Sequence, residues 1–466
     1  MRIAIIGAGW AGMAAAVQLT ESGHHATVFE ASRSMGGRAK GLMEKLPDGS
    51  QVMLDNGQHI LIGAYTETLR LMRLVGVDPD RALLRLPLTL KFPDDTGLEF
   101  SDWPAPLNAL GGIWRARGWG KRDKVTLLLA ASAWRLRGFT CDPSHSVAQL
   151  CARVTPRILH ELIEPLCVSA LNTPADRASG QVFLRVMRDA LFGEGGHSDL
   201  MLPRVDLSSL FPRAAAHWIA RNTVQNSVQD NVFGRGGQVN LGHRMHLVYP
   251  DKRTGGWVLE LDNYDAVILA TSSDDACRAL ANMDTRAPKE LADEVDGWVR
   301  CARALQHEMI ATVYAWGPGI QLPRPMLALR SDAGKSAPAD NSAPAQFVFD
   351  RGQLGGPSGL LAFVVSASQG DRSSIEAQVL AQARQQLGLT LQRVQTIVEK
   401  HATFACTPGL KRPATRIAAN LYACGDYVDG PYPATLEGAV RSGVAAANAA
   451  TQLAPKPRPH PHLIHP

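Results

Sequence analysis

The chain has 466 residues, 45% apolar and 20% charged, so we expect two or three folded domains and exclude a disordered or fibrous protein. The net charge of +5 gives no argument for nucleic acid as a partner. Seven cysteines without a Cys-x-x-Cys pair exclude a disulfide framework and a zinc finger. They indicate a reducing, cytoplasmic compartment, and we predict no metal site.

The first thirty residues show the pattern of a strand, a tight turn, a helix and a second strand. Residues 2–6 are an apolar run typical of a buried strand, and residues 26–29 form the second strand, which ends at Glu30. Between them stands Gly7-Ala-Gly9-Trp-Ala-Gly12, followed by an alanine-rich helix. This full context predicts a dinucleotide site rather than an ordinary glycine-rich turn.

Each of these residues has a physical role in such a site. Gly7 permits the turn, Gly9 lets the backbone approach a pyrophosphate, and Gly12 lets the helix pack closely on the strand. The amino end of the helix faces the phosphates, and Glu30 binds ribose hydroxyls.

A second glycine pair follows the acidic residue. Residues 31–38 contain Arg33, Gly36, Gly37 and Arg38, which extend the phosphate cradle with backbone and positive charge. This stretch resembles the extended FAD signature of the flavin amine oxidase and phytoene desaturase superfamily. The resemblance implies that Arg33, Gly37 and Arg38 bind the pyrophosphate region and that the cofactor is FAD rather than NAD.

Two later segments fit the same domain. Residues 237–247, 258–261 and 266–272 alternate as strands do, and the superfamily resemblance implies that the backbone of Met245 holds adenine. Residues 421–426 form a strand ending in Gly425-Asp426, before a proline-rich turn and a helix of small residues. Similar FAD proteins bind ribitol with this aspartate and point the helix at the flavin, with Gly438 and Ala439 nearest the ring.

The predicted fold class is therefore α/β: a Rossmann-type FAD-binding domain of discontinuous segments plus an α+β substrate domain. We assign residues 1–79, 211–284 and 401–452 to the FAD-binding domain. Residues 80–210 form a largely helical insertion on the substrate and membrane side, and residues 285–400 form the sheet and helices of the substrate domain. We expect a loose loop at 331–345 and a disordered, proline-rich and histidine-rich tail at 453–466.

Three further motifs make the resemblance more specific. They are Asp55-Asn-Gly-Gln-His59 with the residues that follow it, Glu164-Pro-Leu-Cys-Val-Ser-Ala-Leu-Asn172, and Phe349-Asp350-Arg351-Gly. Together they resemble the hydroxysqualene dehydroxylase family, a squalene-associated, FAD-dependent desaturase-like family of bacterial hopanoid operons. The resemblance implies reductive removal of the allylic hydroxyl of hydroxysqualene to give squalene, and a substrate-binding role for Asn172 and Arg351.

That reaction needs an acid to help water leave, a hydride for the carbon, and a pocket that excludes water. Reduced flavin supplies the hydride from N5, and an external electron donor must reduce the flavin. The candidate acids are His59, Asp55 and Asp350, with His59 ranked first because it titrates near neutral pH. The alternatives are that His59 only hydrogen-bonds the loop or flavin, that Asp55 caps a turn, and that Asp350 and Arg351 form an internal ion pair.

The positive charge is concentrated in residues 114–137. This stretch contains seven Lys or Arg side chains against one acid, Asp123, with Trp103, Trp114, Trp119 and Trp134 close by. Such a composition is typical of a helix in the interface of an anionic membrane. The alternative is a helical pair that covers the substrate domain with a solvated basic face. The first interpretation places the protein in the cytoplasm and peripherally on the inner face of the membrane.

Two other functions remain open on this scaffold. A carotenoid-precursor desaturase or an amine oxidase would keep the flavin and reverse the electron flow. A non-catalytic prenyl-binding protein, like the Rab GDP-dissociation inhibitors, would have lost the flavin-binding residues, whereas Glu30, Arg38 and Asp426 are present here.

Overall fold

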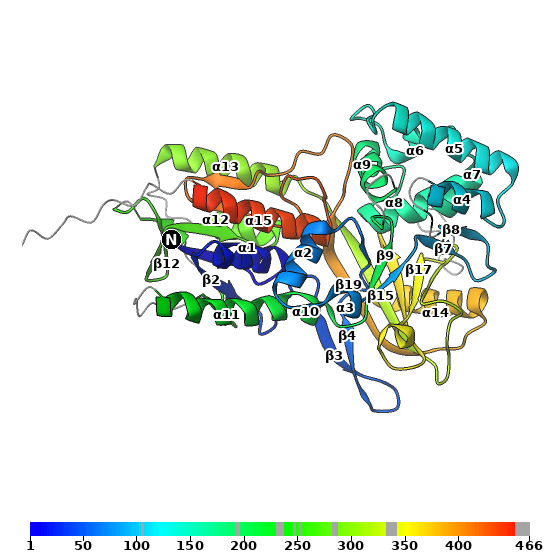
Figure 1. Ribbon diagram of the computed structural model, residues 1–466, viewed down its shortest axis with the longest axis horizontal. Coiled ribbons are helices and arrows are strands. Elements are labelled where there is room, and N and C mark those ends of the chain that lie inside the picture. The colour runs from blue at the N-terminus through cyan, green and yellow to red at the C-terminus, as the bar shows by residue number, and fades with distance from the viewer. Residues whose placement is uncertain are drawn as a thin grey trace, which may run out of the picture.

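The protein is elongated and consists of two bodies that lie side by side (Figure 1). The computed structural model describes residues 1–101, 103, 107–191, 196–229, 237–245, 248–251, 253–281, 288–331 and 343–452. The predicted tail at 453–466 and most of the predicted loop at 331–345 lie outside these residues.

The first body is built around a six-stranded sheet with the order β10-β2-β1-β14-β21-β20. Neighbouring strands from β10 to β21 are parallel, and β20 pairs antiparallel with β21. The strands come from three separated parts of the chain, which confirms a discontinuous Rossmann-type domain. They are β1 (Arg2–Ile6), β2 (His25–Glu30), β10 (Gln238–Leu241), β14 (Ala266–Leu269), β20 (Arg416–Ala418) and β21 (Leu421–Ala423).

The strand β1 is covered on both faces because its side chains alternate between two cores. Ile3 and Ile5 pack with α1 (Trp10–Glu21), α11 (Pro212–Gln229) and α15 (Leu436–Gln452). Ala4 and Ile6 belong to the core that holds α12 (Ser273–Ala281), α13 (Lys289–Arg303) and the small sheet of β11 (Val248–Pro250), β12 (Trp257–Leu259) and β13 (Asp262–Tyr264). Helix α13, which falls in the segment assigned to the substrate domain, packs instead against α12 and β20.

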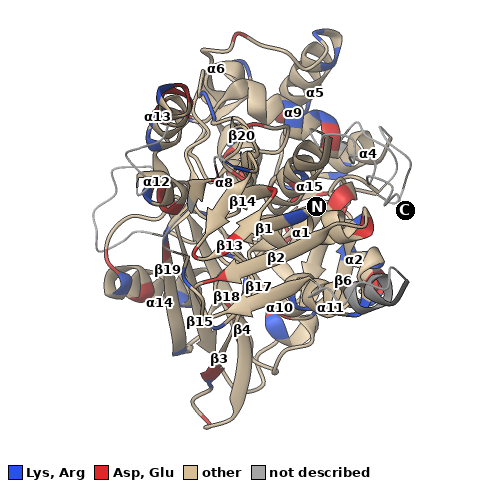
Figure 2. Ribbon diagram, turned by 90° about the vertical axis from the view of Figure 1, so that its left-hand side faces the viewer, with Lys and Arg blue, Asp and Glu red and all other residues tan. Residues whose placement is uncertain are grey.

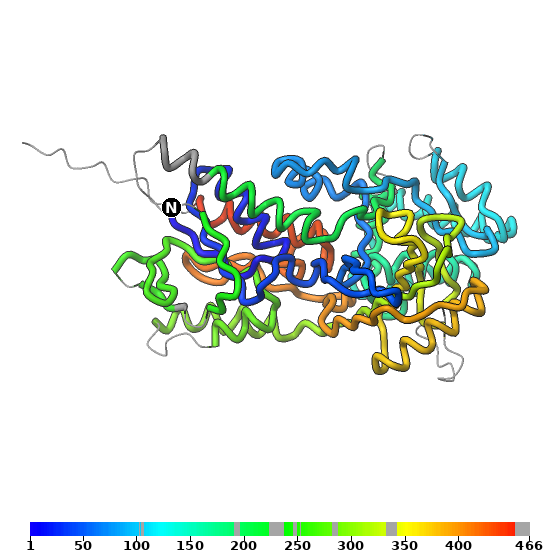
Figure 3. Tube along the Cα trace, turned by 90° about the horizontal axis from the view of Figure 1, so that it is seen from below, coloured from blue at the N-terminus to red at the C-terminus, as the bar shows by residue number. Residues whose placement is uncertain are grey.

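The first and last helices of the described residues meet in this body, as the blue and red segments of Figure 3 show. Helices α1 and α15 touch backbone to backbone, since a Cβ on Gly443 would lie 2.1 Å from the Ala11 carbonyl oxygen. The fully buried Glu437 of α15 accepts hydrogen bonds from the amides of Glu67 and Thr68, at the start of α2 (Thr66–Leu74). The Arg441 guanidinium pairs with the same carboxylate at 2.7 Å, which balances its buried charge.

The second body contains a five-stranded antiparallel sheet with the order β16-β17-β18-β15-β19. Its strands are β15 (His307–Trp316), β16 (Met326–Ala328), β17 (Phe347–Asp350), β18 (Leu360–Ser366) and β19 (Gln392–Phe404). One face packs on α14 (Arg372–Leu387), which buries Val313, Val348 and Phe363. The alternate residues Phe347, Phe349 and Val364 point to the opposite face and the larger core.

Among the remaining elements, some pack against that opposite face through the larger core, and others contribute buried side chains to the core of α1, α11 and α15. The remaining elements are β3 (Gly41–Lys45), β4 (Gln51–Asp55), β5 (Leu61–Ile62), α3 (Pro79–Ala82), β6 (Leu83–Leu86), β7 (Thr89–Lys91), β8 (Gly97–Glu99), α4 (Leu107–Arg115), α5 (Lys121–Leu136), α6 (Val147–Leu150), α7 (Pro156–Ile158), the π-helical turn η1 (Leu159–Ile163), α8 (Glu164–Leu171), α9 (Gly180–Leu191), β9 (Leu200–Pro203), α10 (Leu207–Leu210) and the 3₁₀ turn η3 (Arg351–Leu354). The residues before Asp55 form strand β4, which pairs with β3 in a hairpin and does not enter the six-stranded sheet. Among the described residues, no helix has the length and apolar character needed to cross a bilayer.

Candidate active site

A cavity of about 890 Å³ runs between the two bodies. One part is lined by the turns of the six-stranded sheet, including Gly7, Gly9, Glu30, Gly37 and Asp426. The other part is lined by the five-stranded sheet and by α8 and α9. Glycine turns that belong to a parallel sheet therefore open into the same space as apolar side chains from the second body.

The turn between β1 and α1 presents bare backbone to the cavity. A Cβ on Gly9 would meet only the Gly37 Cα at 4.0 Å, and the first turn of α1 has no side-chain cap. Its free amide groups and the helix dipole favour an anion at this point. Gly12 does not line the cavity, but a Cβ there would lie 2.0 Å from the Gly7 carbonyl oxygen. Its role is the close packing of the helix on the turn.

The Glu30 carboxylate is held at the end of β2 by two backbone amides. Ala8 N–H and Ser32 N–H each donate to it at 2.8 Å, which leaves further lone pairs on the two oxygens for hydroxyl groups in the cavity. Arg33 requires a correction. It is exposed and does not line the cavity, so the bend after Glu30 removes it from the pyrophosphate region.

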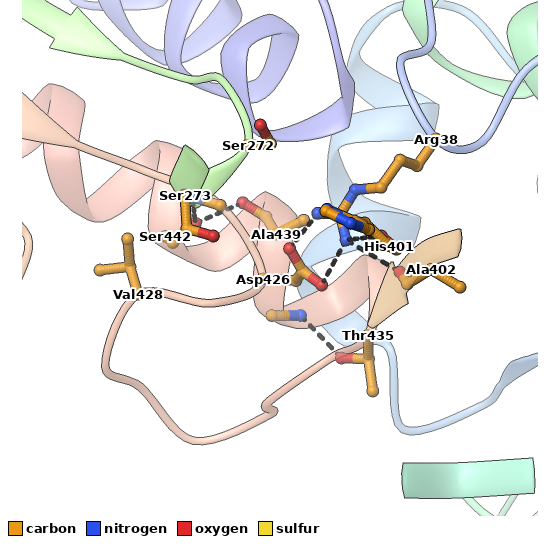
Figure 4. A network of polar contacts seen from close by, with 12 residues as sticks. Arg38, Ser272, Ser273, His401, Ala402, Asp426, Val428, Thr435, Ala439 and Ser442 are labelled. Carbon is orange, nitrogen blue, oxygen red and sulfur yellow. Dashed lines mark hydrogen bonds and ion pairs between the residues drawn. The ribbon is translucent and has the colours of Figure 1, made fainter. Parts of the chain in front are cut away.

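Arg38 and Asp426 both line the cavity, and their side chains point toward each other, as Figure 4 shows. The Arg38 guanidinium donates to both oxygens of the Asp426 carboxylate and to the Ala402 carbonyl oxygen at 2.8 Å. The Asp426 side chain is only 8% exposed. Two charged groups that are expected at neighbouring parts of one cofactor are thus brought together from opposite ends of the chain.

Of the other expected cofactor residues, Met245, Gly425 and Ala439 line the cavity and Gly438 does not. The Gly438 amide donates to Thr435 Oγ1 at 3.0 Å, and a Cβ would lie 1.8 Å from the Tyr432 carbonyl oxygen. Gly438 therefore shapes the turn that precedes α15, and Ala439 is the residue that reaches the cavity.

The substrate side of the cavity is mainly apolar, and sequence reasoning missed most of it. Its side chains cannot hydrogen-bond a polar ligand but suit a hydrocarbon. Phe347 and Phe349 alternate with other residues along β17, and this pattern in the sequence places both on one face of the strand. The apolar residues that line this side of the cavity include Ile62, Leu88, Leu166, Val186, Met187, Leu200, Ile310, Phe347, Phe349 and Val364.

His59 is the one expected acid that lines the cavity. Its Nδ1 lies 2.7 Å from the Gly57 carbonyl oxygen, so the neutral ring carries its proton on Nδ1 and leaves Nε2 as an acceptor. Burial lowers the pKa of His59 below its usual value of 6.5, with a smaller contribution of the same sign from Arg38. The neutral form is therefore favoured at neutral pH.

Asp55 and Asp350 lie outside the cavity, contrary to expectation. Asp55 is 2% exposed and accepts from Leu207 N–H at 2.8 Å, and burial raises its pKa to about 6. The Asp350 carboxylate accepts from the amides of Leu322 and Gly352 and from Gln353 Nε2. Because both carboxylates are occupied by loop backbone groups, they fix chain turns and do not reach a ligand in the cavity.

The two expected substrate residues differ in position. Asn172 lines the cavity, but its amide donates to Thr403 Oγ1 at 2.9 Å and accepts from Ala367 N–H at 2.7 Å. Arg351 is 4% exposed, does not line the cavity, and donates to Gln58 Oε1 at 3.2 Å. The Asp350–Arg351 ion pair, which was the alternative to an acid role for Asp350, is not among the ion pairs of the described residues. Arg351 therefore stabilises the loop that carries His59. Three carboxylates that were not expected from the sequence, Asp189, Asp275 and Glu399, also line the cavity.

The model of flavin-containing amine oxidoreductases matches residues 10–451. The chain belongs to this family. As a flavin-containing amine oxidoreductase it is an FAD-dependent oxidoreductase, and the bare turn at Gly9, the uncapped start of α1 and the amide-held Glu30 fit that cofactor.

Two curated relatives are similar over nearly the whole chain. Hydroxysqualene dehydroxylase of Rhodopseudomonas palustris is 26% identical over 95% of this chain and 97% of that protein. The protein of the same name from Sinorhizobium fredii is 24% identical over 96% and 97%. A solved oxidoreductase of Methanosarcina mazei has a TM-score of 0.69, with 15% identity, over 96% of this chain and 100% of that one, which shows the shared fold.

Alanine substitutions at Gly9 and Gly12 should have separate effects, the first on FAD affinity and the second on the free energy of unfolding. For Gly9→Ala we expect FAD to bind at least about tenfold more weakly, a loss of about 1.4 kcal/mol, because the methyl group enters the space beside the backbone. The φ of −75° at Gly9 suits alanine, so the free energy of unfolding of the apoprotein should change by less than about 1 kcal/mol.

Gly12→Ala should lower that unfolding free energy by about 3 kcal/mol through overpacking. Denaturant unfolding of the apoproteins and FAD titration by fluorescence measure the two quantities. Equal effects of the two substitutions on unfolding, or unchanged FAD affinity in Gly9→Ala, would contradict these roles.

Proposed function

We propose that this enzyme reduces hydroxysqualene to squalene. The observation that carries the proposal is the two-sided cavity, in which groups suited to FAD adjoin a long apolar wall and the His59 imidazole. The similarity to two proteins named hydroxysqualene dehydroxylase, over nearly their whole length, supports the same substrate.

In the proposed reaction, the allylic C–O bond breaks, one proton converts the leaving hydroxyl to water, and a hydride forms the new C–H bond. When bound and reduced, FAD supplies that hydride, and an external two-electron donor restores the reduced cofactor. The apolar side chains around the substrate, including Leu166, Phe347 and Phe349, exclude water and offer no nucleophile to trap an electron-deficient allylic carbon.

We assign the proton donor to His59. Its Nδ1 is anchored on the Gly57 carbonyl oxygen, which fixes the ring and leaves Nε2 for the proton that is delivered. The lowered pKa makes the imidazolium a stronger acid than free histidine, at the cost of a smaller protonated fraction at neutral pH.

The direction of electron flow distinguishes this function from its alternatives. Under anaerobic conditions with dithionite as the reductant, the FAD-loaded enzyme should convert hydroxysqualene to squalene and water. Gas chromatography with mass spectrometry measures the product. Unchanged hydroxysqualene with reduced flavin, together with an extra double bond formed when the enzyme carries oxidised FAD, would support a desaturase instead. A purified protein without bound flavin would support a non-catalytic prenyl-binding protein.

For His59→Gln, kcat should fall by about 10²- to 10⁴-fold, while the flavin absorbance of the purified enzyme is retained. In the wild-type enzyme, kcat should fall as pH rises through the lowered pKa, because only the imidazolium donates a proton. The variant should lose this pH dependence. Full turnover by His59→Gln with bound flavin would remove His59 from the mechanism.

We also propose that α4 and α5 bring the enzyme to an anionic membrane, where a hydrocarbon substrate resides. Trp119, Leu127 and Trp134 are buried, so the inner face of α5 covers the substrate body. On its outer face Val125, Leu129 and Leu136 are 52%, 65% and 89% exposed, and Trp114 at the end of α4 is 73% exposed. Lys121, Arg122, Lys124 and Arg135 lie on the same helix, and Figure 2 shows the Lys and Arg positions of α5 in blue, as suits a helix in the interface.

The triple substitution Trp114→Ser, Leu129→Ser and Leu136→Ser should weaken co-sedimentation with phosphatidylserine-containing vesicles by at least about tenfold, since it removes the inserted apolar area. Lys121→Glu with Arg122→Glu should weaken it mainly at low salt. The control is Leu261→Ser, a 97% exposed leucine in the other body, which should bind like the wild type. Undiminished vesicle binding by both α5 variants would contradict the proposal.

A further inference from the structure

Three metal-ligating side chains meet where the two bodies join. Asp274 lies in the first turn of α12, His307 begins β15, and His401 lies in β19. One ligand atom from each lies within 4.8 Å of the others. His401 Nδ1 is 3.0 Å from an Asp274 carboxylate oxygen, and the two imidazole rings stack with centroids 4.6 Å apart.

This set of ligands suits a particular class of ion. Two imidazoles and one carboxylate are ligands that Zn²⁺ and its neighbours in the first transition series prefer, whereas Mg²⁺ and Ca²⁺ prefer oxygen atoms throughout. Tetrahedral coordination places ligand atoms about 3.3 Å apart. The His401 and Asp274 side chains are 55% and 41% exposed, so they are free to make that small adjustment, and water can complete the coordination.

We propose that Asp274, His307 and His401 bind one divalent cation of the first transition series, such as Zn²⁺. The sequence gives no signal for the site, because the three residues are far apart in the chain and none belongs to a short metal-binding motif. The expectation of no metal site rested on cysteine spacing, which does not bear on a site made of histidine and aspartate.

The bound ion ties the first body to the second beside the cofactor cavity. Arg38 donates to the Ala402 carbonyl oxygen at 2.8 Å and to the His401 carbonyl oxygen at 3.4 Å, and it pairs with Asp426 in the same network (Figure 4). Ser272, just before α12, lines the cavity. The ion therefore fixes α12 against β15 and β19, and it stabilises the folded enzyme by binding that state alone.

The test is Zn²⁺ titration of the FAD-loaded enzyme by calorimetry. The parent protein carries His460→Ala, His462→Ala and His465→Ala, which remove the tail histidines as competing ligands, and every variant is made in this parent. We expect one Zn²⁺ per chain, at least about tenfold weaker binding in His401→Ala and in Asp274→Asn, and no competition by Mg²⁺. Zn²⁺ should also raise the Tm of the parent and not that of His401→Ala.

The matched control is His243→Ala, because His243 and Glu260 form an exposed pair at 3.1 Å without a second imidazole. Its Zn²⁺ affinity should equal that of the parent. A parent that binds no Zn²⁺, or affinities unchanged by both His401→Ala and Asp274→Asn, would overturn the site. Asp274→Asn keeps the side-chain volume, so the test does not depend on a variant that packs differently.

Discussion

The structure depends on the close approach of the α1 backbone to two neighbours, the Gly7 turn and α15. Gly12 lets α1 rest on the turn at Gly7, and Gly443 lets α15 rest on Ala11. These contacts hold the first and last helices of the FAD-binding body together, with the Glu437 carboxylate tying α15 to α2. Since the cofactor-binding turns come from both ends of the chain, a site for FAD forms only when these ends are joined.

The same arrangement explains how one cavity serves two chemically different ligands. Parallel strands end in turns that offer amides and charged groups to a dinucleotide. The antiparallel sheet of the second body alternates, so one face packs on α14 and the other lines the cavity with Ile310, Phe347, Phe349 and Val364. A reaction that needs both a flavin and a dry hydrocarbon pocket fits the boundary between these surfaces.

The sequence predicted the parts of the fold whose signals are local. The strand, turn and helix from Arg2 to Glu21 follow from apolar runs and glycine spacing, and the Gly425-Asp426 turn from its strand and the helix after it. The candidate site was less predictable, because Asp55, Asp350 and Arg351 stand in distinctive motifs but use their polar atoms on the backbone or on Gln58. A sequence motif gives the residue types and their spacing, but it does not show whether a side chain faces a ligand or a loop. The apolar wall and the Asp274, His307 and His401 cluster arise from tertiary contacts that no short window contains.

The central claim is that the enzyme's own reduced flavin is consumed in removing the hydroxyl group. The direct test is an anaerobic single turnover, in which enzyme with fully reduced FAD and no excess reductant is mixed with hydroxysqualene. Flavin absorbance and squalene are measured over time. The account predicts one equivalent of FAD oxidised for each squalene formed, at equal rates. Squalene formed while the flavin stays reduced, or flavin left reduced with no product, would contradict it.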